Sequence, residues 1–289
     1  MRKLNQIVMT SMLSLTTINA YAITVDGNLS DWGILVADGT SSQPVGTNYS
    51  GLRSDLAAYQ LEDTNDLSNN YYLGPNYGGQ NYDGEFFGAQ RDGSTLYLSI
   101  LSGQRPDNGS NSSGGLFSPG DIRIETSLGV FGIEVGGGPV GNSGGAITEG
   151  ANGSTYRVNS SGYTTGHTSL STQTAGSVWF GADWILDPIS PRQPVQMSIN
   201  SSSTLAGTAD YIFTRNAVTS QHSIIELALD MDIFGGATVY DMYWLPSCGN
   251  DELHLSTQIA SVPEPTSIAL LGLGLLGIGL MRRRGKSIQ

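Results

Sequence analysis

Short alternations of apolar and polar residues, separated by turn-forming residues, run along the chain from residue 23 to residue 260. Residues 94–101 (STLYLSIL) and 121–126 (DIRIET) show the pattern most clearly. Period-two alternation places one set of side chains on each face of an extended strand. The same pattern recurs in six further segments, each followed by a Gly, Asn or Pro turn signal: 129–136, 176–184, 194–200, 209–215, 222–230 and 238–245.

Repeated short strands with turn residues between them predict an all-β fold, an antiparallel β-sandwich of jelly-roll type. Two long segments rich in Gly, Ser and Asn, 103–120 and 136–154, are too polar to hold a core, and we expect them to be surface loops. The only helical signal inside this domain is a turn or two around residues 229–234. We therefore expect one β domain over residues 23–260.

The N-terminus has the three parts of an export signal. Arg2 and Lys3 provide a positive start, residues 7–18 are mostly apolar, and Ala20 and Ala22 flank Tyr21 in a small-x-small cleavage pattern. We expect residues 1–22 to form a signal helix that is removed after export. Ile23 would then be the first residue of the exported protein.

The charge of the exported domain restricts its partners. Residues 23–260 contain 7 arginines, no lysine and 24 carboxylates, and 7 minus 24 gives a formal charge of −17. A field of this sign repels phosphate backbones, so we expect no nucleic acid partner. Neutral sugars, basic partners and divalent cations remain compatible with this charge. The charge could also serve solubility alone.

A single cysteine, Cys248, cannot form an internal disulfide, so the domain must rely on its hydrophobic core. Its neighbours Trp244, Leu245 and Leu253 favour a buried thiol. An intermolecular bond is the alternative.

Three acidic residues are candidate ligands for a hard cation such as Ca²⁺. In an extended segment Asp83 and Glu85 project to the same face, and Asp121 joins them if the fold brings it close. The competing interpretation is a solvated strand face.

Four tyrosines interleaved with Asn and Gly are candidates for binding glycan: Tyr71, Tyr72, Tyr77 and Tyr82. Aromatic faces stack on sugar rings, and amides reach the hydroxyl groups. Ordinary packing and turn formation is the competing interpretation.

The sequence contains no convincing catalytic constellation, and we expect a protein that is not an enzyme. Ser143 lies in a G-x-S-x-G match without the strand and helix that a nucleophile turn requires. A polysaccharide hydrolase would need two carboxylates about 5–10 Å apart in a cleft. The close pairs that the sequence offers are Asp83 with Glu85 and Asp230 with Asp232.

The C-terminal segment 261–289 combines three elements. Pro263, Glu264 and Pro265 precede an apolar stretch over residues 268–281, and Arg282, Arg283 and Arg284 follow it. As a helix the stretch would cover about 21 Å, less than the roughly 30 Å of a bilayer core, and its arginines would stay in the cytoplasm. We expect a short hydrophobic helix that crosses the inner membrane only transiently.

This tail resembles the PEP-CTERM sorting signal, also described as an ice-binding protein C-terminal motif. The resemblance implies processing by an exosortase in a Gram-negative bacterium that makes exopolysaccharide and biofilm matrix. It also implies a final location at the cell envelope, the outer surface or the extracellular matrix.

The opening residues 23–32 (ITVDGNLSDW) are similar to those of DOMON and family 9 carbohydrate-binding sandwiches. Together these features predict a non-enzymatic surface or matrix protein that binds extracellular polysaccharide. A purely structural matrix protein and a polysaccharide hydrolase are the alternatives.

Overall fold

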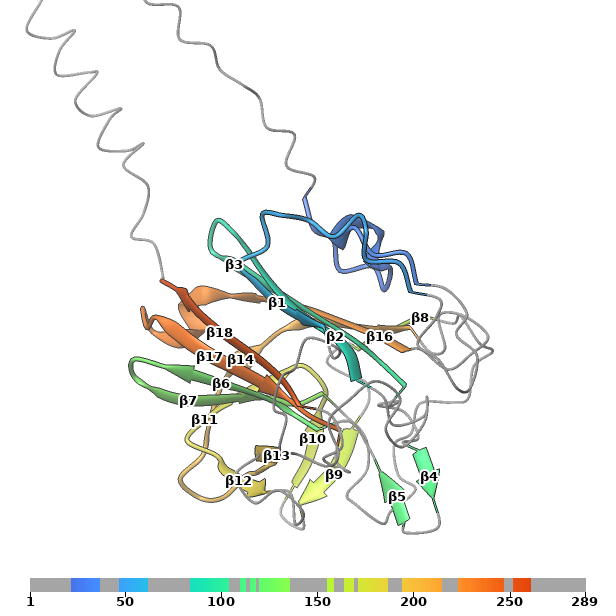
Figure 1. Ribbon diagram of the computed structural model, residues 1–289. Helices are drawn as coiled ribbons and strands as arrows, with labels where there is room; N and C mark the ends of the chain where they lie inside the picture. The colour runs from blue at the N-terminus through green and yellow to red at the C-terminus, as the bar shows by residue number, and fades with distance from the viewer. Residues whose placement is uncertain are drawn as a thin grey trace, which may run out of the picture.

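A computed structural model gives the arrangement of the chain (Figure 1). It describes residues 22–36, 47–61, 84–103, 110–112, 115–117, 120–135, 155–158, 164–168, 171–186, 194–214, 223–246 and 252–260.

Sheet 1 has six strands, and each strand pairs antiparallel with its neighbours. The central pair is β3 with β16, which align residue for residue from Thr95↔Asp230 to Ser102↔Ser223. In spatial order the strands are β1 (Ala58–Leu61), β2 (Gly84–Asp92), β3 (Thr95–Ser102), β16 (Ser223–Asp230), β15 (Asp210–Thr214) and β8 (Thr155–Val158).

Sheet 2 also has six strands, all paired antiparallel. A β-bulge between Val239 and Asp241 interrupts the register of β17 against both of its neighbours. In spatial order the strands are β14 (Thr204–Thr208), β11 (Ser177–Phe180), β7 (Gly129–Ile133), β6 (Ile122–Thr126), β17 (Val239–Trp244) and β18 (Leu253–Ile259).

Three two-stranded hairpins and two 3₁₀ turns complete the described elements. The turns are η1 (Leu29–Trp32), capped by the Asn28 side chain, and η3 (Met231–Phe234), capped by the Asp230 side chain. The hairpins pair β4 (Ser110–Ser112) with β5 (Gly115–Phe117), β9 (Thr164–Thr168) with β10 (Ser171–Thr174), and β12 (Asp183–Leu186) with β13 (Pro194–Ser198).

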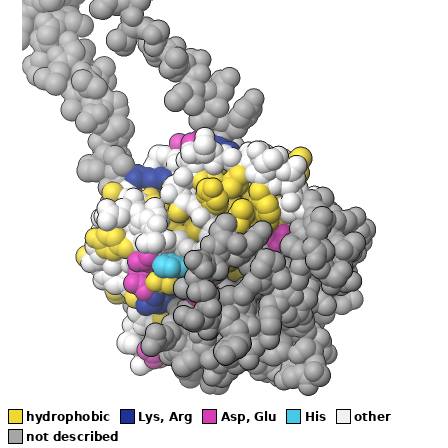
Figure 2. All heavy atoms as spheres, in the orientation of Figure 1, with side chains coloured by type: hydrophobic (Ala, Val, Ile, Leu, Met, Phe, Trp, Pro, Cys, Tyr) yellow, Lys and Arg dark blue, Asp and Glu magenta, His cyan; other side chains and the backbone are white. Residues whose placement is uncertain are grey.

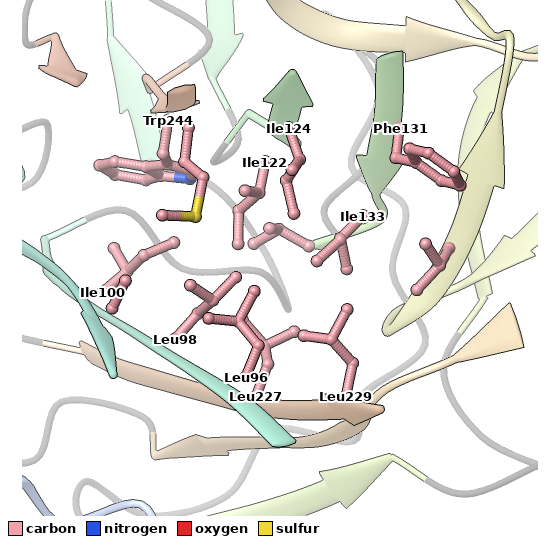
Figure 3. Packing of buried hydrophobic residues seen from close by; sticks show 14 of the residues in the cluster. Leu96, Leu98, Ile100, Ile122, Ile124, Phe131, Ile133, Leu227, Leu229 and Trp244 are labelled. Carbon is pink, nitrogen blue, oxygen red and sulfur yellow. The ribbon is translucent and has the colours of Figure 1, made fainter. Parts of the chain in front are cut away.

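The two large sheets face each other across a shared hydrophobic core, so the described domain is a sandwich. Figure 3 shows Leu96, Leu98 and Leu227 of sheet 1 opposite Ile122 and other apolar residues of sheet 2. Polar bonds also join the layers: the Tyr211 hydroxyl on β15 donates to the carbonyl of Val135, 2.5 Å away. Because alternate residues of each strand point into this core, the remaining residues form two outer faces.

The N-terminal segment, residues 22–57 as far as they are described, covers the outer face of sheet 1 (Figure 1). Its Ile23, Leu29, Trp32 and Ile34 form a second buried cluster with side chains of β2, β3 and β16. Sheet 1 is therefore buried on both faces over this area, although its strands alternate in sequence.

The sandwich fold agrees with the sequence prediction, and most predicted strands form. The segment 176–184 is different: it divides into β11 and β12 around Gly181, whose φ of +70° is incompatible with a continuous strand. The expected helical turn at 229–234 is η3. The surface segment 103–120 contains the hairpin β4–β5.

The signal helix up to residue 21 and the helix predicted at 268–281 lie outside the described residues. Within the part of the chain that the structure describes, no helix has the length and apolar character needed to cross a membrane.

Candidate functional site

A row of paired residues crosses the outer face of sheet 2, opposite the core. Trp179 of β11 pairs with Gly132 of β7, Gly132 with Arg123 of β6, Arg123 with Tyr243 of β17, and Tyr243 with His254 of β18. Each residue follows or precedes a buried core residue on its strand, so the alternation of the strands directs all of them outward. We call this set the outer row.

Arg123 lies at the middle of the outer row, between two aromatic rings. Its guanidinium carbon is 5.7 Å from the ring centre of Tyr243 and 5.9 Å from that of Trp184. Both distances are within the range of a cation–π contact. Arg123 also forms an ion pair with Glu125, two residues away on the same face of β6. The guanidinium is therefore held in place, and so are the rings beside it.

Tyr243 and His254 stack with their ring centres 4.2 Å apart and their planes 5° from parallel. The imidazole Nε2 is 2.9 Å from Oδ1 of Asp241, one strand away. Burial, and then the nearby Asp241 and Glu125, raise the pKa of the Tyr243 hydroxyl to about 12, which keeps it a neutral hydrogen-bond donor. The stack is a flat surface with a carboxylate at its edge.

These side chains are partly open to solvent. The His254 side chain is 35% exposed and that of Asp241 26%, against 21% for Arg123 and 37% for Glu125. Figure 2 shows a histidine at the surface beside acidic side chains and a basic one, with hydrophobic side chains close by. A ligand can therefore reach this set without unfolding a strand.

The hairpin β12–β13 brings Trp184 onto the outer face. It packs against β7 at Gly132, where an added Cβ would lie 2.0 Å from Met197 Sδ and 3.0 Å from the Trp184 ring. Only glycine leaves room for the hairpin at this point of the row. The hairpin is also bonded to the sheet through Asp121, whose carboxylate accepts from the amides of Met197, at 2.9 Å, and Val135, at 3.1 Å.

The predicted cation ligands are placed by different elements. Asp121 is fully buried and binds the backbone of β13 and the end of β7. Glu85 of β2 is also buried, and its Oε2 accepts from Thr47 Oγ1 at 3.1 Å and Tyr49 Oη at 3.2 Å in the N-terminal segment. Asp83 lies outside the described residues. In the described part of the chain no three His, Cys, Asp or Glu side chains form a metal-binding group, and the calcium site stays a prediction.

Other residues singled out in the sequence also lie outside the described part. These are the four candidate glycan-binding tyrosines Tyr71, Tyr72, Tyr77 and Tyr82, together with Ser143 and Cys248. Of the second carboxylate pair, Asp230 caps η3 by accepting from the amide of Asp232 at 3.0 Å. Asp230 therefore has a structural role.

Sequence reasoning missed the outer row. The alternation in residues 238–245 does place Asp241 and Tyr243 on one face, but it cannot tell which strands lie beside them. The strand β18, which contributes His254, was not among the predicted strands. The missing information was the pairing of strands.

A buried carboxylate, Glu226 of β16, fastens the N-terminal segment to sheet 1. Its Oε1 accepts from Trp32 Nε1 at 2.8 Å, and its Oε2 accepts from the amides of Gly27 at 2.6 Å and Asp26 at 3.2 Å. Burial raises the pKa of Glu226 to about 8. The hydrogen bonds act in the opposite direction, and the charges of Asp31 and Asp26 add to the effect of burial. Glu226 is buried and its oxygens bind the N-terminal segment, so we assign it to the fold.

Comparison with known proteins gives one match. A family model described as the PEP-CTERM protein-sorting motif matches residues 261–284. The chain carries a PEP-CTERM sorting motif. The motif implies export, processing by an exosortase and sorting to the cell envelope or surface. It includes Pro263, Glu264, Pro265 and the three arginines, as the sequence predicted.

No curated protein matches the chain, and no solved structure matches its fold. The similarity of the β domain to DOMON and family 9 carbohydrate-binding sandwiches therefore stays a prediction.

Proposed function

We propose that this PEP-CTERM protein is a non-enzymatic surface or matrix protein that binds an extracellular polysaccharide through the outer row of sheet 2. The single observation that carries the proposal is the Tyr243–His254 stack, held between Arg123 and Asp241 on a half-exposed sheet face. Exosortase sorting would bring such a face to the place where exopolysaccharide accumulates.

The chemistry of the outer row suits a sugar polymer. The C–H groups of a pyranose ring pack on an aromatic face, and the hydroxyl groups need fixed donors and acceptors beside it. Tyr243 and Trp184 supply the faces, while Asp241, Glu125 and Arg123 supply the polar groups. Because contacts already hold these side chains, little rotamer entropy would be lost on binding.

The charge of the domain indicates which polymers to expect. The outer row contains one guanidinium and is contacted by two carboxylates, those of Glu125 and Asp241, and residues 23–260 carry a formal charge of −17. An acidic polysaccharide would approach against this field, whereas a neutral or amine-bearing one would not. We expect retention on cellulose-like or chitosan-like polymers and none on alginate-like polymers.

The test is a polysaccharide pull-down with the exported chain and its Tyr243→Ala variant. Loss of the stacking face should weaken binding at least about fivefold, which corresponds to roughly 1 kcal/mol. Tyr240→Ala is the matched control, because it removes an exposed tyrosine (39%) from the same strand but not from the outer row. Repeating the measurement with calcium and with a chelator tests the predicted calcium dependence.

The outcomes separate the candidate functions. No retention of the parent chain on any polymer would contradict polysaccharide binding and would favour the purely structural role. Equal retention of both tyrosine variants would mean that binding, if present, lies elsewhere on the molecule.

A further inference from the structure

One carboxylate oxygen in the N-terminal segment is buried without a partner. Oδ2 of Asp31, in η1, accepts from the Thr24 amide at 2.6 Å and from Thr24 Oγ1 at 3.0 Å. Oδ1 of the same carboxylate is enclosed and has no hydrogen bond within the described part of the chain. Burial is the main cause of a raised pKa for Asp31, and Asp26 adds to it. Thr24 thus stabilises the charge at Oδ2, whereas Oδ1 lacks a donor.

The residue before Thr24 is Ile23, which the sequence predicts to be the first residue after signal-peptide removal. Its side chain is 5% exposed and packs in the cluster that contains Trp32 and Phe86, while Ala22 is exposed. Among the described residues no hydrogen bond involves the Ile23 amide. The predicted scissile bond therefore lies one residue before the amide that binds Oδ2 of Asp31.

We propose that cleavage of the Ala22–Ile23 bond completes the site, with the new α-ammonium of Ile23 donating to Oδ1 of Asp31. Hydrolysis by a signal peptidase uses one water: the leaving nitrogen becomes an ammonium with three protons, and Ala22 departs with a carboxylate. The released charge and the half-buried carboxylate then form an ion pair. This inference rests on the predicted cleavage site and does not depend on polysaccharide binding.

The geometry allows the pair with a small local adjustment. The Cα atoms of Ile23 and Thr24 are about 3.8 Å apart, and the Thr24 nitrogen is already on Oδ2. Two successive main-chain nitrogens can bind the two oxygens of one carboxylate. The buried Ile23 side chain limits how far the new terminus can move away.

None of the charged side chains described around Asp31 donates a hydrogen bond to its Oδ1. Asp26 is acidic and increases the need for a cation at Asp31. Arg53 directs its guanidinium to Asp55 at 2.7 Å and donates to the main-chain carbonyl of Asp31 at 3.4 Å, and the charge of Asp31 contributes to the raised pKa of Arg53. An α-ammonium is the cation that export itself would provide.

The ion pair would fasten the segment that Glu226 also holds. Asp31 is one residue before Trp32, whose indole binds Glu226, and Gly27 binds the same carboxylate. Before cleavage this segment would be held less firmly, so removal of the signal peptide would tighten the exported domain. The signal sequence thus delays the last step of folding until export.

The test compares two N-termini in two backgrounds. The chain from Ile23 to Gln289 is released from a fusion so that it begins at Ile23, and is compared with the same chain preceded by Ala20-Tyr21-Ala22. We expect the free Ile23 terminus to raise the melting temperature by at least about 3 °C at pH 6.5. In Asp31→Asn, which keeps an acceptor for Thr24, the difference between the two termini should fall to within error. Because the comparison is made within each background, any general effect of the substitution cancels.

A second measurement needs no substitution at Asp31. Residues 23–260 contain no lysine, so in a Lys286→Arg background the α-amine is the single amine and can be acetylated selectively. Acetylation should remove the stabilisation. Pairing raises the pKa of the α-ammonium above its unfolded value of about 8, so the stabilisation is present below pH 8 and is lost as the pH rises through the folded pKa.

Two results would overturn the proposal. One is an equal melting temperature for the free, extended and acetylated chains at pH 6.5. The other is a difference between free and extended chains that persists unchanged in Asp31→Asn.

Discussion

Glu226 is the residue whose protonation matters most for the fold. Its carboxyl is 1% exposed and accepts three hydrogen bonds from the N-terminal segment. Two opposing effects act on its pKa: burial disfavours the charged form, and the donors favour it. Burial dominates and raises the pKa to about 8. No sequence pattern foretold this role, since Glu226 and Trp32 are 194 residues apart.

The raised pKa of Glu226 predicts that stability falls with pH. The unfolded pKa of a glutamate is about 4.3, so between that pH and about 8 the folded state binds the extra proton. Stability from this group is complete below the unfolded pKa and is lost as the pH rises through the folded one. We expect the free energy of unfolding, measured in urea from pH 5 to 9, to fall less steeply in Glu226→Gln than in the parent.

Glu125→Gln is the control for this prediction, because it makes the same change of charge at a half-exposed position on sheet 2. It should retain the slope of the parent. Parallel profiles for the parent and Glu226→Gln would show that another group sets the pH dependence.

At the scale of elements, alternation predicted the strands that have one face in the core and the other outside it. β3, β6 and β16 formed where the pattern placed them. Strands such as β14, whose residues are half-buried or exposed, carry little apolar signal and were not predicted. The order of the strands was also beyond the sequence, because register arises from pairing between distant segments, and the outer row exists only through that pairing.

The N-terminal layer is an element whose docking depends on Gly33. This glycine ends η1 with a φ of +80°, and an added Cβ would lie 1.9 Å from the carbonyl oxygen of Gly51. Both the conformation and the contact with backbone exclude a side chain. We expect Gly33→Ala to lower the free energy of unfolding by about 3 kcal/mol or more, as measured in urea.

Gly93→Ala separates the effect of the positive φ from the effect of the close contact with backbone. Gly93 has a φ of +58°, but an added Cβ would meet nothing within 4 Å, so this change should lower the free energy of unfolding by only about 1–2 kcal/mol. If the two variants lose equal stability, the close approach of Gly33 to Gly51 has no energetic importance.

At the scale of the whole molecule, the sequence was most informative about where the protein is sorted in the cell. Three adjacent elements within residues 261–284 suffice for a sorting motif, because a processing enzyme reads a short local segment without reference to the fold. The binding surface proposed for the β domain depends on side chains that the chain brings together from four strands and a hairpin. A motif of adjacent residues can be recognised in the sequence. A site on the face of a sheet cannot, because its residues become neighbours only when the strands pair.

The sorting motif makes a prediction for the intact protein in its host. Replacing Pro263, Glu264 and Pro265 with alanine removes the side chains that distinguish the motif from any short apolar tail. We expect this variant to keep its C-terminal segment and to stay with the inner membrane, while the parent is shortened and moves to the cell envelope or surface. Fractionation followed by immunoblotting with an antibody to the β domain reports both size and location.

Thr266→Ala with Ser267→Ala is the matched control, because it alters the next two residues but leaves the motif side chains intact, and it should be processed like the parent. A host that lacks exosortase should leave the parent in the same state as the alanine variant, since loss of the enzyme and loss of its recognition site block the same step. Identical size and location for the parent and the alanine variant would contradict recognition through these three residues.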